Sequence, residues 1–276
     1  MKYLRILVAS LACFVLFHAC AGAEETRGDL FSALEAKKEF AAEMSVLIAK
    51  AWKKWQDSVL IEDIDVEGSQ GLLLPGDVSK PVLTASDMLA SFDRKGKSQD
   101  YIDCVRAVAG AMENGMRSWQ RGYQNRNLTF PQGASCTFTL PPCSNVPVTV
   151  ASGRSSGDKE MTEDALYSYM LYRAPRNEED ILVVFHGAAR AISGCFTEWK
   201  NSCSIVGIMA SGGIAPQPAP MGTGPGPVRG AKGTGGKLIG PYFDSSAMRG
   251  KMVEYFEIQR TKGRSGSGPL EVALEF

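Results

Sequence analysis

The chain has 276 residues, 44% of them hydrophobic and 22% charged, so it can bury a core and does not have the composition of a disordered protein. Its 30 basic residues equal its 30 acidic residues, which excludes the positive field of a nucleic-acid-binding protein. It contains two histidines, which excludes histidine-rich metal centres and most histidine-based proton relays.

Residues 1–23 have the pattern of a secretory signal peptide. Lys2 and Arg5 form a basic start, an apolar run of twelve residues follows, and three small residues at 21–23 fit a signal-peptidase site. Twelve residues are too few to span a bilayer as a helix, which takes about 20. We therefore expect an exported protein, periplasmic or extracellular. Lipid attachment at Cys20 is a minor alternative, because the residues before it fit a lipoprotein box poorly.

Three long amphipathic helices are predicted, each ending near a tryptophan. Apolar residues recur three, seven, eleven and fourteen positions before Trp55, Trp119 and Trp199, which places them on one stripe of a helix. We interpret these tryptophans as core residues. The predicted helices run from Asp29 to Gln56, from Asp100 to Gln120 and from Glu178 to Lys200. Asn177 and the acidic residues after it are typical of a helix N-cap.

Short strands and short helices are predicted after the long helices. Apolar residues alternate at Ile64 and Val66 and again at Leu128 and Phe130, which indicates strands with one buried face. A Gly/Pro turn follows each strand. Two shorter helices are predicted at residues 85–92 and 163–172, the second with Thr162 as its N-cap.

Five cysteines follow the leader, and an odd number implies at least one unpaired thiol in an oxidising compartment. The simplest disulfide pairs are Cys136 with Cys143 and Cys195 with Cys203. Alternatively, Cys104 and Cys195 are small core hydrophobes, because cysteine is among the most buried residue types. No spacing is Cys-x-x-Cys, so neither a zinc knuckle nor a thioredoxin-type motif is indicated.

One segment resembles part of an α/β-hydrolase. Residues 183–187 resemble its strand and His-Gly turn, and residues 209–213 resemble a nucleophile elbow centred on Ser211. Met209 stands where the first glycine belongs, and His186 precedes the serine, whereas that class has its histidine after it. The helical pattern also turns His186 about 140° from the apolar stripe, toward solvent.

The segment from Ser211 to Gly240 is rich in glycine and proline and has no charged residue before Arg229, which predicts a long flexible loop. Loops on a rigid scaffold commonly carry function, so we expect it to contact a protein partner. Residues 230–238 resemble a phosphate-binding loop. However, Ala231 replaces the first glycine and Leu238 replaces the magnesium-binding hydroxyl, so no nucleotide cofactor is expected.

The last residues alternate between apolar and polar or small, which predicts a closing strand at 269–276. We expect it to pair with a strand at residues 252–259. This ending resembles the last strand of an outer-membrane barrel, but the long helices leave no room for the other strands that a barrel needs.

Aligned on the three tryptophans, the chain divides into three similar units, at about 27–97, 98–175 and 176–260. Each unit has a Pro-Val dipeptide with an alanine three residues after the valine, at Pro81-Val82, Pro147-Val148 and Pro227-Val228. One such unit cannot bury its apolar face alone. We therefore expect a single α+β domain over 24–276, in which three tandem helix–strand–Gly/Pro-loop–short-helix units share one core and the long helices pack on a small sheet.

These patterns favour an exported, non-enzymatic structural or protein-interaction module of a bacterial cell envelope or a secreted assembly. Packing residues repeat along the chain, whereas polar residues do not form a repeated or convergent group. Two alternatives stay open: a periplasmic serine hydrolase with Ser211 as nucleophile and His186 as base, and a periplasmic protein that binds a small ligand between its helices. We expect no cofactor, metal or nucleic-acid partner.

Overall fold

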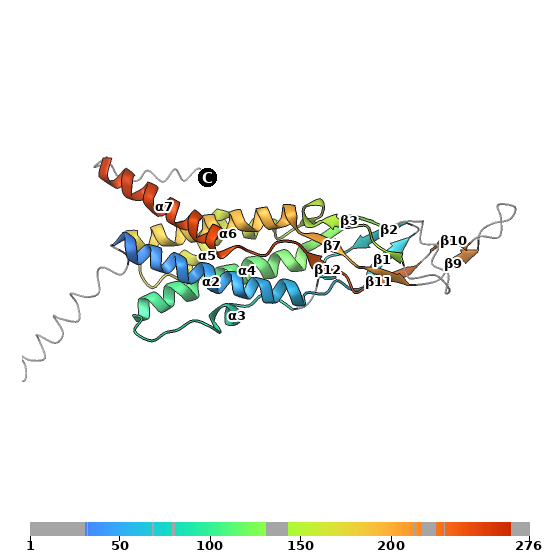
Figure 1. The fold of residues 1–276 in the computed structure, drawn as a ribbon, viewed down its shortest axis with the longest axis horizontal. Helices are drawn as coiled ribbons and strands as arrows, with labels where there is room; N and C mark the ends of the chain where they lie inside the picture. The colour runs from blue at the N-terminus through green and yellow to red at the C-terminus, as the bar shows by residue number, and fades with distance from the viewer. Residues whose placement is uncertain are drawn as a thin grey trace, which may run out of the picture.

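The computed structural model describes residue 31 and the ranges 33–67, 69–78, 81–130, 143–211, 214–216, 225–228 and 230–265. Within these ranges it has six α-helices and antiparallel sheets, so the α+β class is confirmed. The molecule is elongated, with a helix bundle in one half and the strands in the other (Figure 1). No helix in the described ranges combines the length and the hydropathy that crossing a membrane requires. The predicted leader lies outside these ranges.

The long helices agree with the periodicity of the sequence. They are α2 (Leu34–Ser58), α4 (Gln99–Gly122) and α6 (Glu179–Ser202). The shorter helices are α3 (Ala85–Leu89) and α5 (Glu163–Tyr172), with 3₁₀ turns η1 (Val150–Ser152) and η2 (Asp158–Met161). The hydroxyl of Thr162 accepts a hydrogen bond from the Ala165 amide, as predicted for the N-cap of α5. The predicted cap at Asn177 is wrong, because α6 has Glu178 at that position and no side-chain cap.

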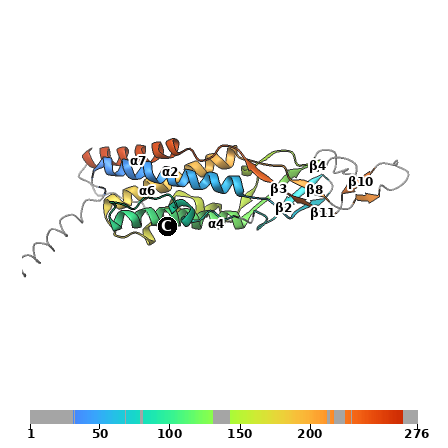
Figure 2. The same ribbon diagram turned by 60° about the horizontal axis from the view of Figure 1, so that its bottom comes forward.

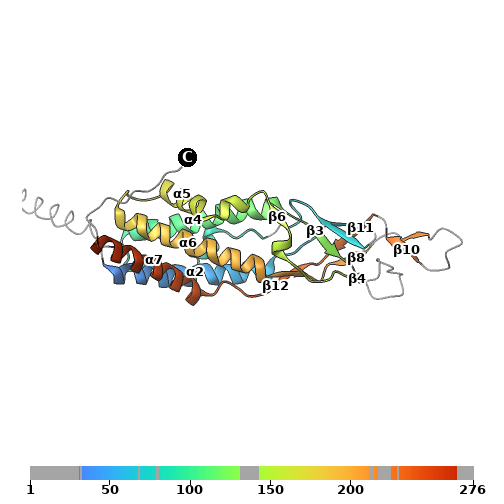
Figure 3. The same ribbon diagram turned by 90° about the horizontal axis from the view of Figure 1, so that it is seen from above.

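A further long helix, α7 (Ser245–Ser265), replaces the strand expected at residues 252–259. Its buried residues Met248, Met252 and Phe256 are four positions apart, which is one face of a helix. This face packs against α2 and α6 (Figure 3). The closing strand predicted at 269–276 lies outside the described residues, and the partner strand expected for it is helical.

The strands are short and pair antiparallel throughout. A seven-stranded sheet has the order β4-β8-β11-β1-β2-β3-β6, a three-stranded sheet has the order β12-β7-β5, and β9 pairs with β10. Their bounds are β1 (Ile64–Glu67), β2 (Gln70–Leu73), β3 (Tyr123–Thr129), β4 (Cys143–Ser144), β5 (Val148–Thr149), β6 (Arg154–Ser155), β7 (Ser204–Val206), β8 (Met209–Ser211), β9 (Ile214–Pro216), β10 (Pro225–Val228), β11 (Ala231–Thr234) and β12 (Lys237–Ile239).

The sheet continues from the ends of the helices instead of covering their sides. The chain passes from α4 into β3 with no intervening residue, and from α6 into β7 through Cys203 alone. The long helices therefore pack on one another, and the expected packing of helices on a sheet face is not what the structure shows (Figure 1). We call the strands of the seven-stranded and three-stranded sheets, with β9 and β10, the β arm.

An aromatic cluster fills the junction between the bundle and the β arm. Trp55, Trp119 and Trp199 are each at most 3% exposed, and the ring of Trp199 lies 5.8 Å from that of Trp55 and 5.5 Å from that of Trp119. Trp52 stacks on Phe243 with ring centroids 3.8 Å apart. The last turns of all three long helices thus meet in one core.

Buried amides satisfy most of the polar atoms of this cluster. The side-chain oxygen of Gln56 accepts hydrogen bonds from the indoles of Trp52 at 3.1 Å and Trp199 at 2.9 Å. The carbonyl of Pro81 accepts from the indole of Trp55 at 3.1 Å and from the side-chain amide of Gln120 at 3.0 Å. Since a buried polar group without a partner costs about 1–3 kcal/mol, these bonds fix how the helices meet.

Candidate functional site

The segment from Ser211 to Gly240, expected as a flexible loop, is largely strand where the structure describes it. Ser211 ends β8, and β9, β10, β11 and β12 follow within the segment. β11 lies inside the seven-stranded sheet, between β8 and β1. The prediction of a loop is therefore wrong for these residues. The prediction failed because glycine and proline both weaken the residue pattern by which a strand is recognised.

The phosphate-loop resemblance at residues 230–238 corresponds to β11, a turn and β12. No helix follows these glycines, so the segment lacks the helix N-terminus that binds phosphate in such loops. Two of its glycines permit close packing instead. A Cβ at Gly233 would lie 2.7 Å from the side chain of Ile208, and a Cβ at Gly236 would lie 2.6 Å from it. These glycines allow two strand backbones to approach the arm's apolar core.

We call β9 and β10 the distal hairpin. These strands pair with each other, through Ile214 with Val228 and Pro216 with Pro225, and belong to neither of the other sheets. They lie beyond the seven-stranded sheet, at the end of the molecule opposite the helix bundle (Figures 1 and 2). Proline has no amide hydrogen and is typical of edge strands that must not pair indiscriminately. The hairpin is thus a distal element with limited capacity to extend the sheet.

Polar contacts beside the hairpin hold the start of β11 and the residue before it to β1. The amide of Gly230 donates to Glu67 Oε1 at 2.9 Å, and Lys232 Nζ lies 2.5 Å from Asp65 Oδ1. The hydrogen bond with Asp65 raises the pKa of Lys232. Because the side chains of Lys232 and Asp65 are about half exposed, 56% and 48%, solvent screens this ion pair and it adds little to the stability of the arm. Asp63 beside it has a φ of 61°, in the left-handed region.

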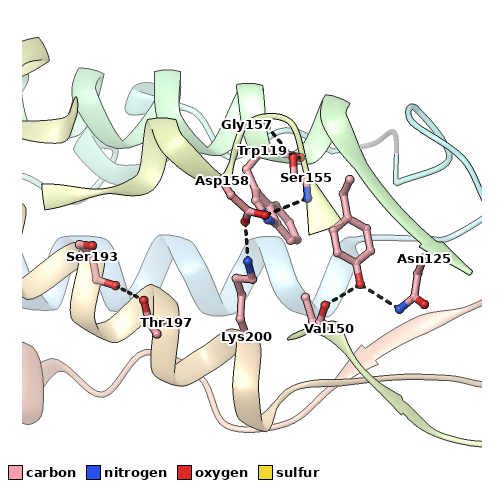
Figure 4. A network of polar contacts seen from close by, with 10 residues as sticks. Trp119, Asn125, Val150, Ser155, Gly157, Asp158, Ser193, Thr197 and Lys200 are labelled. Atoms are coloured by element: carbon pink, nitrogen blue, oxygen red, sulfur yellow. Dashed lines mark hydrogen bonds and ion pairs between the residues drawn. The ribbon is translucent and has the colours of Figure 1, made fainter. Parts of the chain in front are cut away.

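A buried polar network joins strand β3 to the 3₁₀ turn η1 (Figure 4). The hydroxyl of Tyr123 donates to the carbonyl of Val150 at 2.8 Å and accepts from Asn125 Nδ2 at 3.2 Å. Asn125 also donates to the hydroxyl of Ser152 at 3.0 Å. Tyr123 and Asn125 are each 1% exposed, and this burial raises the pKa of Tyr123. Tyr123 and Asn125 are two positions apart in β3, and this alternation is the sequence signal that both side chains face inward.

A second part of the network ties the ends of α4 and α6 together (Figure 4). The hydroxyl of Ser155 donates to the carbonyl of Trp119 at 2.7 Å, and its amide donates to Asp158 Oδ2 at 2.8 Å. The other oxygen of Asp158 lies 2.5 Å from Lys200 Nζ. The backbone must approach closely here, since a Cβ at Gly157 would lie 2.3 Å from the carbonyl carbon of Ser118.

The side chain of Asn145 has a similar role between β7 and β8. Its side-chain oxygen accepts from the Ile208 amide at 2.8 Å, and its side-chain nitrogen donates to the Ile205 carbonyl at 3.0 Å. Asn145 is 5% exposed. It therefore replaces backbone pairing where the chain passes from β7 to β8. Nothing in the sequence around Asn145 indicated this role.

The structure does not bring Ser211 and His186 together. Ser211 ends β8 in the β arm, and its backbone pairs with Lys232. His186 lies in the bundle, sixteen residues before the end of α6, which is about 24 Å along the helix axis. The geometry of a nucleophile and its base is absent.

His186 is also less exposed than the helical pattern predicts. Its side chain is 35% exposed, because α5 and α7 cover the face of α6 that a single helix would leave to solvent. The ring stacks on Tyr255 with centroids 5.1 Å apart and lies 4.8 Å from Tyr167. Nδ1 of His186 is 3.1 Å from Glu163 Oε1, but the two atoms are not aligned as a hydrogen bond.

The disulfide expected between Cys195 and Cys203 does not form. Both thiols are free and buried, as is that of Cys104. Eight residues of helix separate Cys195 from Cys203, about 12 Å, whereas a disulfide needs Cα atoms within about 7 Å. Burial raises the pKa of Cys195 to about 11 and that of Cys203 to about 12, so both are unreactive thiols.

The other expected pair stays a prediction. Cys143 begins β4, but its side chain is not among those that the structure describes, and Cys136 lies outside the described residues. Within the described part of the chain, no three histidine, cysteine or acidic side chains are grouped so as to hold a metal ion.

Comparison of the chain with protein-family models, with curated proteins and with solved structures gave no match. The fold and the site together define an elongated α+β protein, in which a helix bundle supports a β arm with a distal hairpin (Figure 3). Its function is inferred from the residues of the chain itself.

Proposed function

We propose that the chain is an exported, non-enzymatic interaction module that binds a protein partner through the distal hairpin. The observation that carries the proposal is the position of β9 and β10 beyond the seven-stranded sheet, paired with each other alone in the described part of the arm (Figure 1). The bundle and the junction cluster form the rigid base that such a contact surface needs. Ser211 and His186 lie in opposite halves, so no observation favours the hydrolase.

Export rests on the leader pattern at residues 1–23. We propose that the mature chain acts in a bacterial cell envelope or a secreted assembly. Mass spectrometry of the purified natural protein tests this, since cleavage after Ala23 leaves Glu24 as the first residue. A lipidated Cys20 at the new N-terminus would instead support membrane anchoring, and an intact leader would contradict export.

We also propose that the three units are tandem copies that share one core. In each unit a long helix leads into strands and the chain then returns to a second helix: α2 to α3, α4 to α5, and α6 to α7. The equivalent tryptophans meet at the junction, where a repeated packing residue would be expected to lie. The finer pattern differs, because the third unit has extra strands and a much longer second helix.

A deletion that spares the rest of the arm tests the contact surface. Ser211 pairs with Lys232 across β8 and β11, so a deletion between these two residues can leave the paired strands in place. Replacing residues 213–230 by Asn-Gly would close these strands with a two-residue hairpin turn. We expect the shortened chain to keep its far-ultraviolet circular dichroism and cooperative unfolding. Loss of cooperative unfolding would show that the hairpin is structural.

Partner contact is tested by a photo-crosslinking residue in the natural host. At position 228, in the distal hairpin, we expect one discrete protein adduct. At position 172, where Tyr172 is 90% exposed at the end of α5, we expect none. The shortened chain carrying the crosslinker at 172 controls for overall expression. An adduct at position 172 alone, or at neither position, would contradict the assignment of the hairpin as the contact surface.

A further inference from the structure

A cavity of about 510 Å³ lies between α6 and α7, with α5 at one side. Its residues come from the facing sides of the two helices, at spacings of three and four. Six polar side chains line it: Glu163, Arg190, Ser193, Lys251, Glu254 and Tyr255. Gly194 and Ile258 complete the wall. The volume is within the range of pockets that hold small molecules.

Of the four charged groups in this cavity, one has an ion pair and a second lies beside a histidine without a hydrogen bond between them. Lys251 Nζ lies 2.8 Å from Glu198 Oε1, and Glu163 lies beside His186. The other two, Arg190 and Glu254, are both exposed, and the described part of the chain provides neither with a hydrogen bond or an ion pair. The guanidinium of Arg190 does lie 6.0 Å from the centre of the Tyr255 ring. An exposed cation and an exposed anion, each without an ion pair in the described part of the chain, therefore line the same space.

Two glycines of α6, Gly187 and Gly194, differ in whether close packing requires a residue without a side chain. A Cβ at Gly187 would lie 2.4 Å from the ring of Phe256, so that glycine is needed for α7 to approach. A Cβ at Gly194 would lie 3.8 Å from the side chain of Lys251, which is an ordinary contact. Glycine inside a helix costs about 1 kcal/mol relative to alanine. At Gly194 close packing does not require this cost, and the missing side chain leaves space in the cavity wall.

We propose that this cavity binds a small zwitterion of the amino-acid class. The ligand's carboxylate is bound by Arg190, whose planar guanidinium can donate two parallel hydrogen bonds, and its ammonium is bound by Glu254. The cavity's formal charges cancel, which favours a dipolar ligand over an anion or a cation. This binding site goes beyond the proposed function and does not depend on the distal hairpin.

Calorimetry with the twenty common free amino acids, each up to about 10 mM, is the first test, since that concentration reveals even millimolar affinity. We expect at least one to bind. Its decarboxylated amine and its deaminated acid each lose one charged contact, so each should bind about tenfold to a hundredfold more weakly. If no amino acid binds, or if an analogue binds as tightly as the amino acid, the proposal is overturned.

Variants then locate the bound ligand. Arg190→Gln and Glu254→Gln should each weaken binding about tenfold or more. Arg249→Gln is the matched charge control, since Arg249 is exposed on α7 outside the cavity. Gly194→Leu should abolish binding by filling the space, whereas Gly250→Leu should not, because nothing lies within 4 Å of a Cβ there.

Two further measurements keep the test decisive. If Gly194→Leu does not fold, Gly194→Ala fills the cavity in part and should still weaken binding, with its fold checked by circular dichroism. The chain with residues 213–230 replaced by Asn-Gly should bind the amino acid as the unchanged chain does. Unaltered affinity in Arg190→Gln and Gly194→Ala would overturn the proposal while leaving that of the hairpin intact.

Discussion

The helix bundle and the β arm are stabilised in different ways. The bundle buries a mainly apolar core, in which the largest side chains are its tryptophans, among them Trp52 and Trp119. The arm has strands of two to seven residues, and beside apolar side chains such as Ile64 it buries the amides of Asn125 and Asn145 among its strands. Apolar burial is nondirectional and tolerates adjustment, whereas a buried amide must keep each of its partners.

This difference gives the two halves different tolerance to mutation. In the bundle, the cost of a change follows the volume removed from the core. In the arm, it follows the number of backbone groups left without a partner. The junction cluster belongs to both halves, since Gln56 joins two indoles of the bundle to the carbonyl of Gly240 at 3.2 Å.

The largest effect is expected from Trp199→Ala, which tests whether the junction couples the two halves. It removes a ring that contacts Trp52 at 4.9 Å and Trp119 at 5.5 Å, together with the hydrogen bond to Gln56. We expect the free energy of unfolding to fall by about 3–5 kcal/mol in urea titrations. Tyr172→Ala, at a site that is 90% exposed, is the control and should change it by less than about 0.5 kcal/mol.

If the junction couples the two halves, Trp199→Ala should destabilise both of them. Circular dichroism of the helices and hydrogen exchange of the arm strands should report one shared loss of stability. If the arm amides kept their protection while the helices melted early, the junction would not join the halves.

Asn145→Ala should have the next largest effect and should be confined to the arm. The change leaves the Ile208 amide and the Ile205 carbonyl without their partner, which costs about 2–4 kcal/mol. Hydrogen exchange should accelerate in β7 and β8 more than in α2. Asn127→Ala is the matched control, because Asn127 is exposed and its loss leaves one carbonyl, that of Ser152, free to bind water. Equal effects of both variants would contradict the role of burial.

The sequence predicted the helices of the bundle better than the strands of the arm. Long helices repeat their apolar face several times, so the ends of α4 and α6 lie within two residues of the predictions. α7 was not predicted, because Val253 and Tyr255 also pack against the core and its apolar residues therefore extend beyond one stripe. A helix that packs against two neighbours does not show a single period-3.6 face.

The arm and the cavity lacked an equivalent signal. Strands such as β4 and β5 have two residues each, too few for an alternating pattern. Gly233 and Gly236 are required by close packing, yet in the sequence they indicate a loop. The cavity brings Arg190 and Glu254 together from helices far apart in the chain, so its composition follows from tertiary packing alone.

A pair of glycine variants in α6 should separate packing from open space within the bundle. Gly187→Ala should destabilise by about 1–3 kcal/mol, because its methyl group would displace the ring of Phe256. Gly194→Ala should stabilise by about 0.5–1 kcal/mol through helix propensity. Thermal melts should therefore shift in opposite directions. Destabilisation by Gly194→Ala would mean that the neighbouring Lys251 cannot adjust.

The smallest effect is expected from Asp77→Asn in the arm, where charge and hydrogen bonding can be separated. Asp77 Oδ2 accepts from the Leu74 amide at 2.6 Å, and partial burial, followed by the charges of Asp63 and Asp65, raises the pKa of Asp77. A raised pKa means that the folded chain favours the protonated acid. The contribution of Asp77 to stability is therefore fully present below its ordinary pKa of 3.8 and is lost as the pH rises through the raised value.

Asn keeps an acceptor for the Leu74 amide and carries no charge at any pH. At pH 7, Asp77→Asn should thus be more stable than the unchanged chain, by less than about 1 kcal/mol, and this advantage should vanish as the pH falls below 3.8. Asp77→Ala removes the acceptor as well and should be less stable than Asp77→Asn at every pH. Urea titrations at pH 3 to 8 would measure all three chains. Lower stability of Asp77→Asn at pH 7 would show that the carboxylate is stabilised in the arm, and that ionised groups there are held as firmly as the buried amides.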